Sequence, residues 1–288
     1  MNVLSLFDGI SSGMLALERC GIKVDNYYAS EVDKHSIKVS EHNYPNIIQL
    51  GDVTKVTPTM FKDNKIDLLL GGSPCTGFST SGKMLNFEDP QSKLFFEYVR
   101  LLKELNPKYF LLENVVMKQE WQDIISEAVG VRPILINSNL VSAQDRKRLY
   151  WTNIPNVCIP EDKNLKFEHL CARMVGRRIN PLTGKRDDYN KDIKLVQYIE
   201  TRTDGKTNCL TTVQKDNLVV SRNIQRELAT DVDFRYLTAE EYEVLQAVPL
   251  GYTSVASDNQ RKKMLGNGWT VDVISHILNS IKEEKYRD

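Results

Sequence analysis

A cysteine that could act as a nucleophile follows a short, mostly apolar run. Residues 66–70 are typical of a buried strand, and the tight loop Gly71-Gly72-Ser73-Pro74 leads from them to Cys75. Ligands in parallel α/β sheets bind beyond the carboxyl ends of the strands, so this loop brings a thiol to a place where a substrate would lie. A structural cysteine would not need such a loop.

The remaining cysteines carry no such signal. Cys20, Cys158, Cys171 and Cys209 are widely spread and form no Cys-x-x-Cys pair. We interpret them as small, reduced, buried or half-buried residues, and we expect neither a disulfide framework nor a metal site.

A carboxylate and two guanidinium groups lie next to further predicted strands. Glu113 ends the run that begins at residue 109, where it is either a helix cap or a carboxylate that faces a ligand. Arg146 and Arg148 form a basic cluster after residues 133–140, a weak pattern when taken alone. Cysteine, glutamate and arginine at one sheet edge suit nucleophilic attack on an electron-poor ring.

Glycines and acidic residues after the first strands favour a nucleoside ligand. The run Phe7-Asp8-Gly9-Ile10-Ser11-Ser12-Gly13 joins a predicted strand to a helix, where the glycines form either a structural turn or a close approach to a ligand. Glu31 follows the second predicted strand, and Asp52, after Gly51, is a second acidic residue further along the chain. Their carboxylates can accept hydrogen bonds from ribose hydroxyls and an adenine amine, and they disfavour a phosphate-rich ligand.

Alternating strand and helix patterns position these residues. Strands are predicted at 3–7, 27–30, 66–70, 109–112 and 133–140, and helices at 13–19, 33–42, 91–105, 120–128, 238–247 and 271–284. This order predicts an α/β fold with a mostly parallel, doubly wound sheet. From about 160 to 226 short polar segments with turn residues indicate an inserted lobe. We therefore predict a main domain at 1–159, an inserted region at 160–230 and a returning segment at 231–288.

The charge of the chain is balanced overall but uneven along its length. The whole chain has 38 basic and 38 acidic residues, whereas residues 131–226 have 18 basic and 10 acidic ones. Arg177, Arg178, Lys185 and Arg186 alternate there with turn residues, which fits either a solvated surface or a lobe that contacts phosphates. An apolar fraction of 41% excludes a disordered chain.

Targeting and membrane signals are weak in this sequence. The longest apolar stretches are far shorter than the roughly 20 residues that span a bilayer, and the first residues lack the basic lead and apolar region of a signal peptide. We therefore expect a cytoplasmic protein with no membrane partner.

Ordered motifs then make a resemblance specific. They are Phe7-Asp8-Gly9, Gly72-Ser73-Pro74-Cys75, Glu113-Asn114-Val115, Gln144-x-Arg146-x-Arg148, Arg235-x-Leu237-Thr238 with Gln246 and Pro249, and Leu265-Gly266-Asn267-Gly268. In type and order they resemble the DNA cytosine-5 methyltransferase family across essentially the whole chain. Residues 3–10, 29–32, 94–97 and 113–116 are most similar to the catalytic domain of the eukaryotic de novo enzymes. Because only that domain is recognisable, we expect a bacterial or bacteriophage member.

The resemblance implies a Rossmann-like, S-adenosylmethionine-dependent methyltransferase whose inserted lobe recognises the target in duplex DNA. Cys75 would add to carbon 6 of a flipped-out cytosine, so that carbon 5 can accept a methyl group. Glu113 would contact ring nitrogen 3 and the exocyclic amine. Arg148 would hold the ring carbonyl, and Arg146 would support Arg148. No residue stands out as the base that removes the carbon 5 proton.

By the same resemblance, several residues would bind the cofactor or the DNA. The cofactor residues would be Phe7, Asp8, Gly9, Ile10, Ser12, Glu31, Val32, Asp52, Val53, Asn267, Gly268 and Trp269. The DNA residues would be Thr76, Thr211, Thr212 and Val213, with Gln214 and Lys215 as nearby alternatives. The charge pattern adds Arg177, Arg178, Lys185 and Arg186 as phosphate contacts. Two departures from the family matter. Thr76 replaces a common Gln, which leaves open the side chain that fills the vacated duplex position. Val213 stands where the de novo enzymes carry a guanine-reading arginine, so a CpG preference does not transfer.

Two other functions and the oligomeric state stay open at this stage. One branch of the family methylates transfer RNA, but its Cys-Phe-Thr motif is absent from residues 160–230. An inactive regulatory paralogue is disfavoured because the catalytic and cofactor motifs are kept. The run Leu94-Phe95-Phe96-Glu97-Tyr98 fits core packing better than a subunit contact, although a homodimer remains an alternative.

Overall fold

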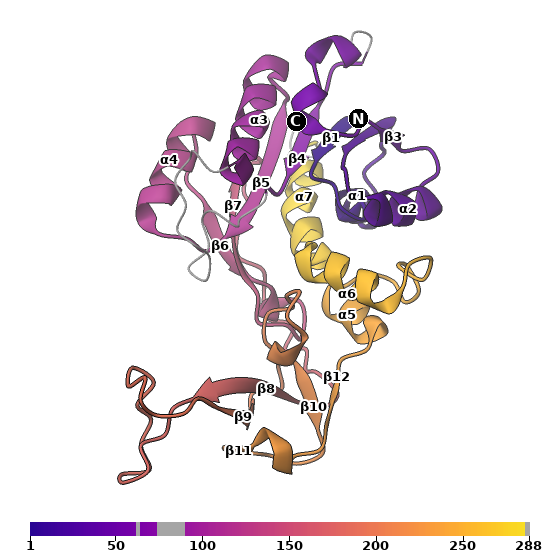
Figure 1. Cartoon of the computed structure of the whole chain (residues 1–288). Coiled ribbons are helices and arrows are strands. Elements are labelled where there is room, and N and C mark those ends of the chain that lie inside the picture. The colour runs from indigo at the N-terminus through magenta and orange to yellow at the C-terminus, as the bar shows by residue number, and fades with distance from the viewer. Residues whose placement is uncertain (62–63, 74–89, 286–288) are drawn as a thin grey trace.

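A seven-stranded sheet forms the centre of the larger part of the molecule (Figure 1). The structure is a computed structural model that describes residues 1–61, 64–73 and 90–285. The strand order is β3-β2-β1-β4-β5-β7-β6. The strands are β1 (Asn2–Leu6), β2 (Asn26–Ser30), β3 (Ile48–Gln49), β4 (Leu68–Gly71), β5 (Tyr109–Val115), β6 (Ile134–Asn137) and β7 (Lys147–Thr152).

The strand order reverses beside β1, which fixes where a ligand can bind. β1 pairs in parallel with β2 on one side and with β4 on the other, and β4 pairs in parallel with β5. The loops that leave β1 and β4 therefore diverge at the carboxyl edge of the sheet, at the switch point where doubly wound folds bind ligands. β7 is the exception, since it runs antiparallel to both β5 and β6. The predicted, mostly parallel α/β fold is thus confirmed.

Helices cover both faces of this sheet. α1 (Ser12–Arg19), α2 (Lys34–Asn43) and α7 (Val271–Lys285) pack on one face, and α3 (Pro90–Leu105) and α4 (Gln119–Val129) pack on the other. α7 places Val273, Ile274, Ile277 and Leu278 in the core at helical spacing. Phe95 is fully buried, whereas the ring of its neighbour Phe96 is 42% exposed and packs edge-on against it. The aromatic run therefore contributes to the core mainly through Phe95 and Tyr98, which is also fully buried.

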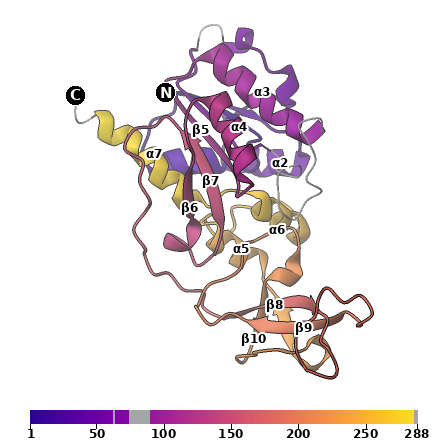
Figure 2. The same cartoon turned by 90° about the vertical axis from the view of Figure 1, so that its left-hand side faces the viewer.

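A smaller, five-stranded antiparallel sheet lies at one end of the molecule. Its order is β11-β9-β8-β10-β12, from strands β8 (Leu170–Arg177), β9 (Val196–Thr201), β10 (Leu218–Val220), β11 (Glu227–Leu228) and β12 (Phe234–Tyr236). A small core of its own includes Ala172, Ile199, Leu218 and Ile224. Figure 2 shows this sheet below the main one, with α5 (Ala239–Leu245) and α6 (Asp258–Asn267) between them. The proposed division at 159 and 230 stays a prediction.

Several elements were not predicted from the sequence, among them β7, α6 and the strands of the smaller sheet. Residues 147–152 form β7, and the basic residues at the start of this strand obscured its strand pattern in the sequence. α6 contains few apolar residues and shows no helical periodicity, although Ser257 and Gln260 form a capping box at its start that could have revealed it. Arg177, which the sequence placed among turn residues, ends β8, a strand whose residues Ala172 and Met174 pack on the small core.

The described part of the chain has no helix long and apolar enough to cross a membrane. In the same residues, the side chains of His, Cys, Asp and Glu form no cluster suited to a metal ion.

Candidate active site

A cavity of about 410 Å³ opens at the switch point of the main sheet. This volume lies in the range of small-molecule sites. Nine of the predicted cofactor residues and three of the predicted catalytic residues line it together. They are Phe7, Asp8, Gly9, Ile10, Ser12, Glu31, Asn267, Gly268 and Trp269 for the first group, and Glu113, Arg146 and Arg148 for the second.

The loop after β1 forms one wall of this cavity in an unusual backbone conformation. Phe7, Gly9 and Ser11 have φ angles of 57°, 61° and 60°, in the left-handed region that non-glycine residues seldom adopt. Such conformations persist where the surrounding structure holds them, and they concentrate at ligand sites. The loop turns its backbone toward the cavity in this way before α1 begins at Ser12.

Asp8 lies beneath this loop and fastens it to the sheet. Its carboxylate accepts hydrogen bonds from the Ser11 hydroxyl at 2.5 Å and from the Tyr27 hydroxyl at 2.7 Å. Burial raises the pKa of the Asp8 carboxyl to about 6, although these hydrogen bonds oppose the rise. Asp8 therefore shapes the cavity wall as well as lining it.

Glu31, at the end of β2, joins two walls of the cavity. Oε2 accepts a hydrogen bond from the Gly9 amide at 2.8 Å, and Oε1 accepts bonds from the amides of Val32 and Asp33 at 2.7 and 2.8 Å. A carboxylate offers about four acceptor positions, so these three bonds leave room for one more donor. The predicted carboxylate for a ribose hydroxyl is therefore fixed in orientation and retains acceptor capacity.

A carboxylate, a guanidinium and an indole meet on the opposite wall. Glu113 Oε1 pairs with Arg148 Nε at 2.9 Å, and Glu113 Oε2 accepts a hydrogen bond from Trp269 Nε1 at 3.1 Å. Burial lowers the pKa of Arg148 but the Glu113 charge raises it, and the net shift is upward. A Cβ atom on Gly72 would come within 2.9 Å of the indole nitrogen, so this glycine lets the group close. Glu113 is thus held by two donors at the cavity surface.

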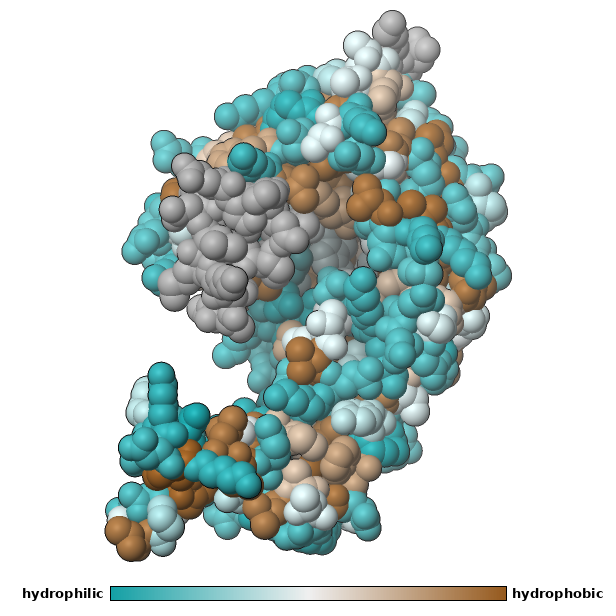
Figure 3. Space-filling model, viewed as in Figure 1, coloured by the Kyte–Doolittle hydropathy of each residue, from teal (hydrophilic) through white to brown (hydrophobic). Residues whose placement is uncertain are grey.

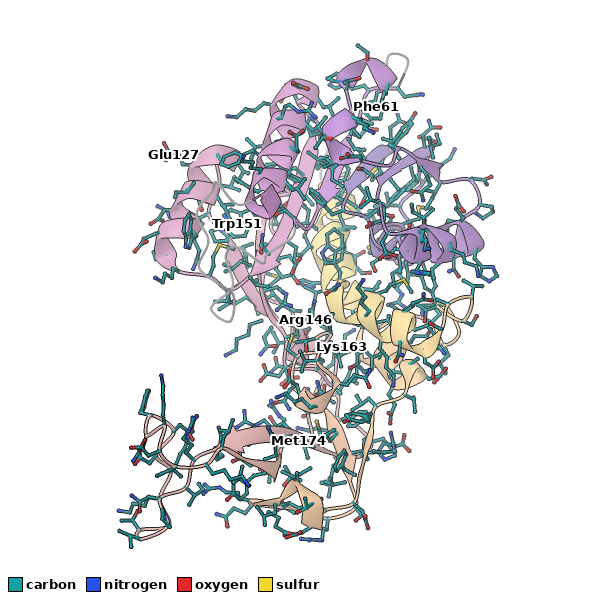
Figure 4. The ribbon with its side chains drawn as sticks, in the orientation of Figure 1. Phe61, Glu127, Arg146, Trp151, Lys163 and Met174 are labelled. Carbon is teal, nitrogen blue, oxygen red and sulfur yellow. The ribbon has the colours of Figure 1, made fainter. Side chains whose placement is uncertain are left out.

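Arg146 occupies the junction between the two parts of the molecule (Figure 4). Its guanidinium donates to the carbonyls of Leu210, Gly266 and Gly268 at 2.9, 3.2 and 2.8 Å. Burial and the nearby Arg148 charge lower the pKa of Arg146. Arg146 therefore fastens the segment before β10 to the end of α6, where the cavity wall lies.

Two buried glutamines reinforce this junction. Gln144 accepts a hydrogen bond from the Leu210 amide at 2.9 Å and donates to Gln246 Oε1 at 3.1 Å. Gln246 in turn donates to the Leu265 carbonyl at 2.6 Å and accepts from the Thr270 hydroxyl at 2.7 Å. These two motif residues act through backbone positions and do not line the cavity.

Other predicted residues lie elsewhere. Cys75 and Thr76 fall outside the residues that the structure describes. Val32, Asp52 and Val53 do not line the cavity: Val32 is 72% exposed, Val53 is buried in the core, and Asp52 caps a short turn through the Thr54 amide at 3.0 Å. The resemblance assigned these three residues by their position in the sequence, which does not indicate which way each side chain turns.

Of the five predicted DNA-contacting cations, the three arginines are engaged within the small lobe, whereas Lys215 is exposed. Arg177 donates to Glu200 at 3.0 and 3.2 Å, and Arg178 donates to the carbonyls of Ile193 and Asp188 at 3.1 Å. Arg186 pairs with Asp188. Lys185 is exposed. Much of the positive charge of residues 131–226 is therefore balanced locally, as at Arg202 with Asp204 and at Arg222 with Glu227.

The cavity also includes residues that the sequence did not single out. Asp33 and Ser36 contribute from the start of α2, and Lys263 and Met264 contribute from α6. Asp33 caps α2 by accepting bonds from the amides of His35 and Ser36, which its position two residues after Glu31 could have suggested. No comparable signal marks Lys263.

The surface between the two parts of the molecule is deeply indented (Figure 3). In that view the indentation opens on the left, between the body that carries the main sheet and the lobe below it. Such a concave surface can receive a large ligand beside the cavity.

Fold, cavity and ordered motifs agree with what a comparison of sequences shows. This chain belongs to the C-5 cytosine-specific DNA methylase family, whose model matches residues 1–171. The resemblance inferred from its motifs is thereby confirmed.

Relatives come from phages and bacteria. The chain is 38% identical over 192 residues to the orphan methyltransferase M.SPRI of Bacillus phage SPR, covering 62% of this chain and 43% of that protein. It is 36% identical over 243 residues to the orphan methyltransferase M.Rho11sI of Bacillus phage rho11s, covering 69% and 48%. It is 44% identical over 115 residues to the type II methyltransferase M.Eco47II of Escherichia coli, covering 39% and 27%. The matched region thus spans less than half the length of each of these relatives.

Solved structures share the fold over nearly the whole chain. The Entamoeba histolytica methyltransferase EhMeth has a TM-score of 0.71 and 16% identity, covering 99% of this chain and 98% of that one. A mutant of Spodoptera frugiperda DNMT2 has a TM-score of 0.67 and 20% identity, covering 98% and 99%. At these identities the comparison shows the fold alone.

Proposed function

We propose that this protein transfers a methyl group from S-adenosylmethionine to carbon 5 of a cytosine in duplex DNA. The observation that carries the proposal is the Glu113 carboxylate, held by Arg148 and Trp269 in the same cavity as the Glu31 loop. The C-5 cytosine-specific DNA methylase family, in which phage and bacterial relatives are named as methyltransferases, supports the same reaction.

The residues of the cavity fit the proposed cofactor. Glu31 offers a spare acceptor position for a ribose hydroxyl, and the left-handed backbone at Gly9 leaves space beside the loop, since a Cβ atom there would meet nothing within 4 Å. Carboxylates outnumber cations around this end, which suits an uncharged sugar and base better than a pyrophosphate. When bound, S-adenosylmethionine supplies an activated methyl group. Phe7, Asn267 and Gly268 would hold it from either side.

The opposite wall would hold the cytosine. Glu113 would contact ring nitrogen 3 and the exocyclic amine, and Arg148, which Glu113 orients, would hold the ring carbonyl. Cys75, which follows the end of β4 by four residues in the sequence, would add as a thiolate to carbon 6 so that carbon 5 takes the methyl group. The thiolate would leave again when a base removes the carbon 5 proton. Arg146 would act as a positioning residue, because its donors already bind backbone carbonyls.

Duplex DNA would lie in the indentation between the main body and the small lobe. A base inside the helix cannot reach an enclosed cavity, so the target cytosine would have to flip out of the stack. Unstacking costs a few kcal/mol, which contacts to the DNA backbone from both parts of the molecule would offset.

Methylation of a random duplex library, read by bisulfite sequencing, tests the activity and returns the sequence context. We expect 5-methylcytosine in the library and a covalent adduct with DNA that contains 5-fluorocytosine. Cys75→Ala should abolish both while cofactor binding persists, whereas Cys158→Ala, which removes an exposed cysteine, should leave both intact. Methyl transfer to small RNA but not to DNA, or an active Cys75→Ala variant, would refute the proposal.

A further inference from the structure

A second groove lies between the small lobe and α6. It has a volume of about 360 Å³ and is lined by Thr211, Thr212, Gln214, Asn259, Lys262 and Lys263. The first three residues belong to the segment between β9 and β10, and the others belong to α6. Lys263 lines this groove and the active-site cavity alike.

The two walls of the groove are held at a fixed separation. A Cβ atom on Gly266 would come within 2.7 Å of the Thr211 carbonyl oxygen, so the absence of a side chain lets α6 and the lobe segment touch. Arg146 binds the carbonyls of Leu210 and Gly266, one on each side of this contact. The groove is therefore preformed and does not depend on a ligand to bring its walls together.

The lobe wall is also ordered by its own hydrogen bonds. Asn208 donates to the Asp216 carbonyl at 2.8 Å, and the Thr211 hydroxyl accepts from the Val213 amide at 3.0 Å. The exposed Thr212 and the half-exposed Gln214 are thus presented on a braced turn. Their hydroxyl and amide groups are donors that suit an anion.

The cations on α6 differ sharply in how their charge is balanced. Arg261 is 7% exposed, and Glu240 and Glu243 pair with it at 2.7 and 3.3 Å. Within the described ranges, Lys263 has one ion pair, with Asp33 at 3.7 Å. Lys262 forms no ion pair with any residue that the structure describes. The charges of Lys262 and Lys263 at the groove are therefore largely unbalanced, whereas the charge of the preceding residue, Arg261, is neutralised.

We propose that this groove binds a backbone phosphate of the DNA, through Lys262 and Lys263 together with Thr212 and Asn259. The inference rests on the proposed function and adds a contact on α6, outside the motifs and outside the basic loop of the small lobe. Two lysines with hydroxyl and amide donors match a phosphodiester, which is a strong acceptor with one negative charge. Because Lys263 borders the active-site cavity, the phosphate would lie close to the flipped nucleotide.

Binding of a duplex oligonucleotide across a salt titration tests this assignment in the full chain. Lys262→Ala should weaken binding about 3- to 10-fold near 0.1 M salt and should lower the slope of log K against log salt by about 0.9, the value for one lost phosphate contact. Lys262→Arg should restore most of both. Lys23→Ala is the matched control, since it removes a 90% exposed charge before β2, at the opposite edge of the sheet.

Duplexes that carry a single neutral methylphosphonate locate the contact. One substituted position should weaken wild-type binding about as much as Lys262→Ala does, and it should have no further effect on that variant. If Lys262→Ala behaves like Lys23→Ala, the assignment is wrong.

Inorganic phosphate, followed by its ³¹P resonance, separates a free anion from DNA as the ligand. Phosphate that binds the wild type and not Lys262→Ala, while DNA affinity is equal in both, would overturn the DNA assignment. The groove assignment and the proposed function can fail separately. If the wild type methylates DNA, and Lys262→Ala binds DNA as tightly as the wild type does, only the groove assignment is refuted. A wild type that neither binds nor methylates DNA refutes both.

Discussion

Asp8 couples the stability of the loop after β1 to pH. Its carboxyl is buried, and the pKa of about 6 lies above the ordinary value of 3.8. The folded state therefore holds a proton that the unfolded chain releases between about pH 4 and pH 6, so this residue makes the fold less stable as pH rises through that window. A shift of this size corresponds to about 3 kcal/mol.

We predict that Asp8→Asn removes this pH dependence. An asparagine can accept from Tyr27 and donate to Ser11 in the same place, without a charge to bury. Urea unfolding of wild type and variant, from pH 4 to pH 7.5, gives the difference in the free energy of unfolding. This difference should shift in favour of the variant as pH rises, by on the order of 3 kcal/mol in total. A difference that stays constant across the range would contradict the prediction.

Arg146 and Arg148 are two residues apart, but we expect substitutions of them to have different effects on stability and activity. Arg146→Met removes a guanidinium that binds three backbone carbonyls in the interior, so we expect a loss of on the order of 3–5 kcal/mol in the free energy of unfolding. Arg148→Met removes the partner of Glu113 at the cavity surface, so we expect a smaller loss of stability and a fall in methyl transfer of about 100-fold or more.

Urea unfolding and a methylation assay on the same two proteins check this contrast. Arg148→Met should bind S-adenosylmethionine nearly as the wild type does, which serves as the control for folding. The reverse pattern, with Arg146→Met stable and inactive, would show that Arg146 contacts the substrate directly.

At the scale of residues, the sequence predicts which side chains meet better than what each one does. Glu113, Arg148 and Glu31 converge as expected at one edge of the sheet. Glu113 lies near the carboxyl end of β5 and Glu31 follows β2, whereas Arg148 reaches the same edge because it lies at the amino end of the antiparallel strand β7. Hydrogen bonds decide the rest: the donors of Arg146 go to backbone carbonyls of segments more than sixty residues away, which no local pattern can indicate. Lys263 is missed for the same reason, since its neighbours come from α2.

At the scale of elements, apolar runs with clear periodicity were predicted to within a few residues, as for β4 and α7. β7 was not, because the basic cluster at 146–148 obscured the short β-prone run 149–152 that follows it. α6 was missed because its residues mostly face solvent, the small lobe and α5, not the main core. Both of these elements carry residues of the site, so the sequence alone left one wall of the cavity undefined.

The contact of α6 with the small lobe depends on one glycine. We predict that Gly266→Ala forces α6 away from Thr211, because the new Cβ atom would lie 2.7 Å from a carbonyl oxygen that cannot rotate away. The expected cost is about 1–3 kcal/mol in the free energy of unfolding, typical of an overpacked contact. Affinity for duplex DNA should fall as well, because the walls of the second groove would separate.

Urea unfolding and DNA binding measure the two effects. Lys93→Ala serves as the control, because it changes an exposed residue on another helix, α3. Gln260→Ala on α6 would not serve, because Gln260 completes the capping box of that helix. A Gly266→Ala protein with unaltered stability would show that the two walls can move apart freely.

At the scale of the whole molecule, the basic residues divide into those that pair with acidic residues and those that are exposed. Within residues 131–226, several arginines are paired with acids and hold the small lobe together, as Arg177 does with Glu200. Lys185, Lys191 and Lys194 are exposed on the long connection between β8 and β9. Only cations of this second kind can release counterions from DNA, because a paired arginine must first give up its partner.

We therefore predict that replacing Lys185, Lys191 and Lys194 together by alanine lowers the salt dependence of DNA binding, whereas Arg177→Ala acts mainly on stability. The triple variant should keep the thermal stability of the wild type and lose up to about 0.9 in the slope of log K against log salt for each lysine that contacts a phosphate. Arg177→Ala should unfold at lower urea, because Glu200 would lose its most buried partner. The opposite result would be an unchanged slope in the triple variant and a reduced slope in Arg177→Ala, with the stability of Arg177→Ala unaltered. It would mean that the ion pair between Arg177 and Glu200 opens when DNA binds and that the arginines of β8 contact the DNA.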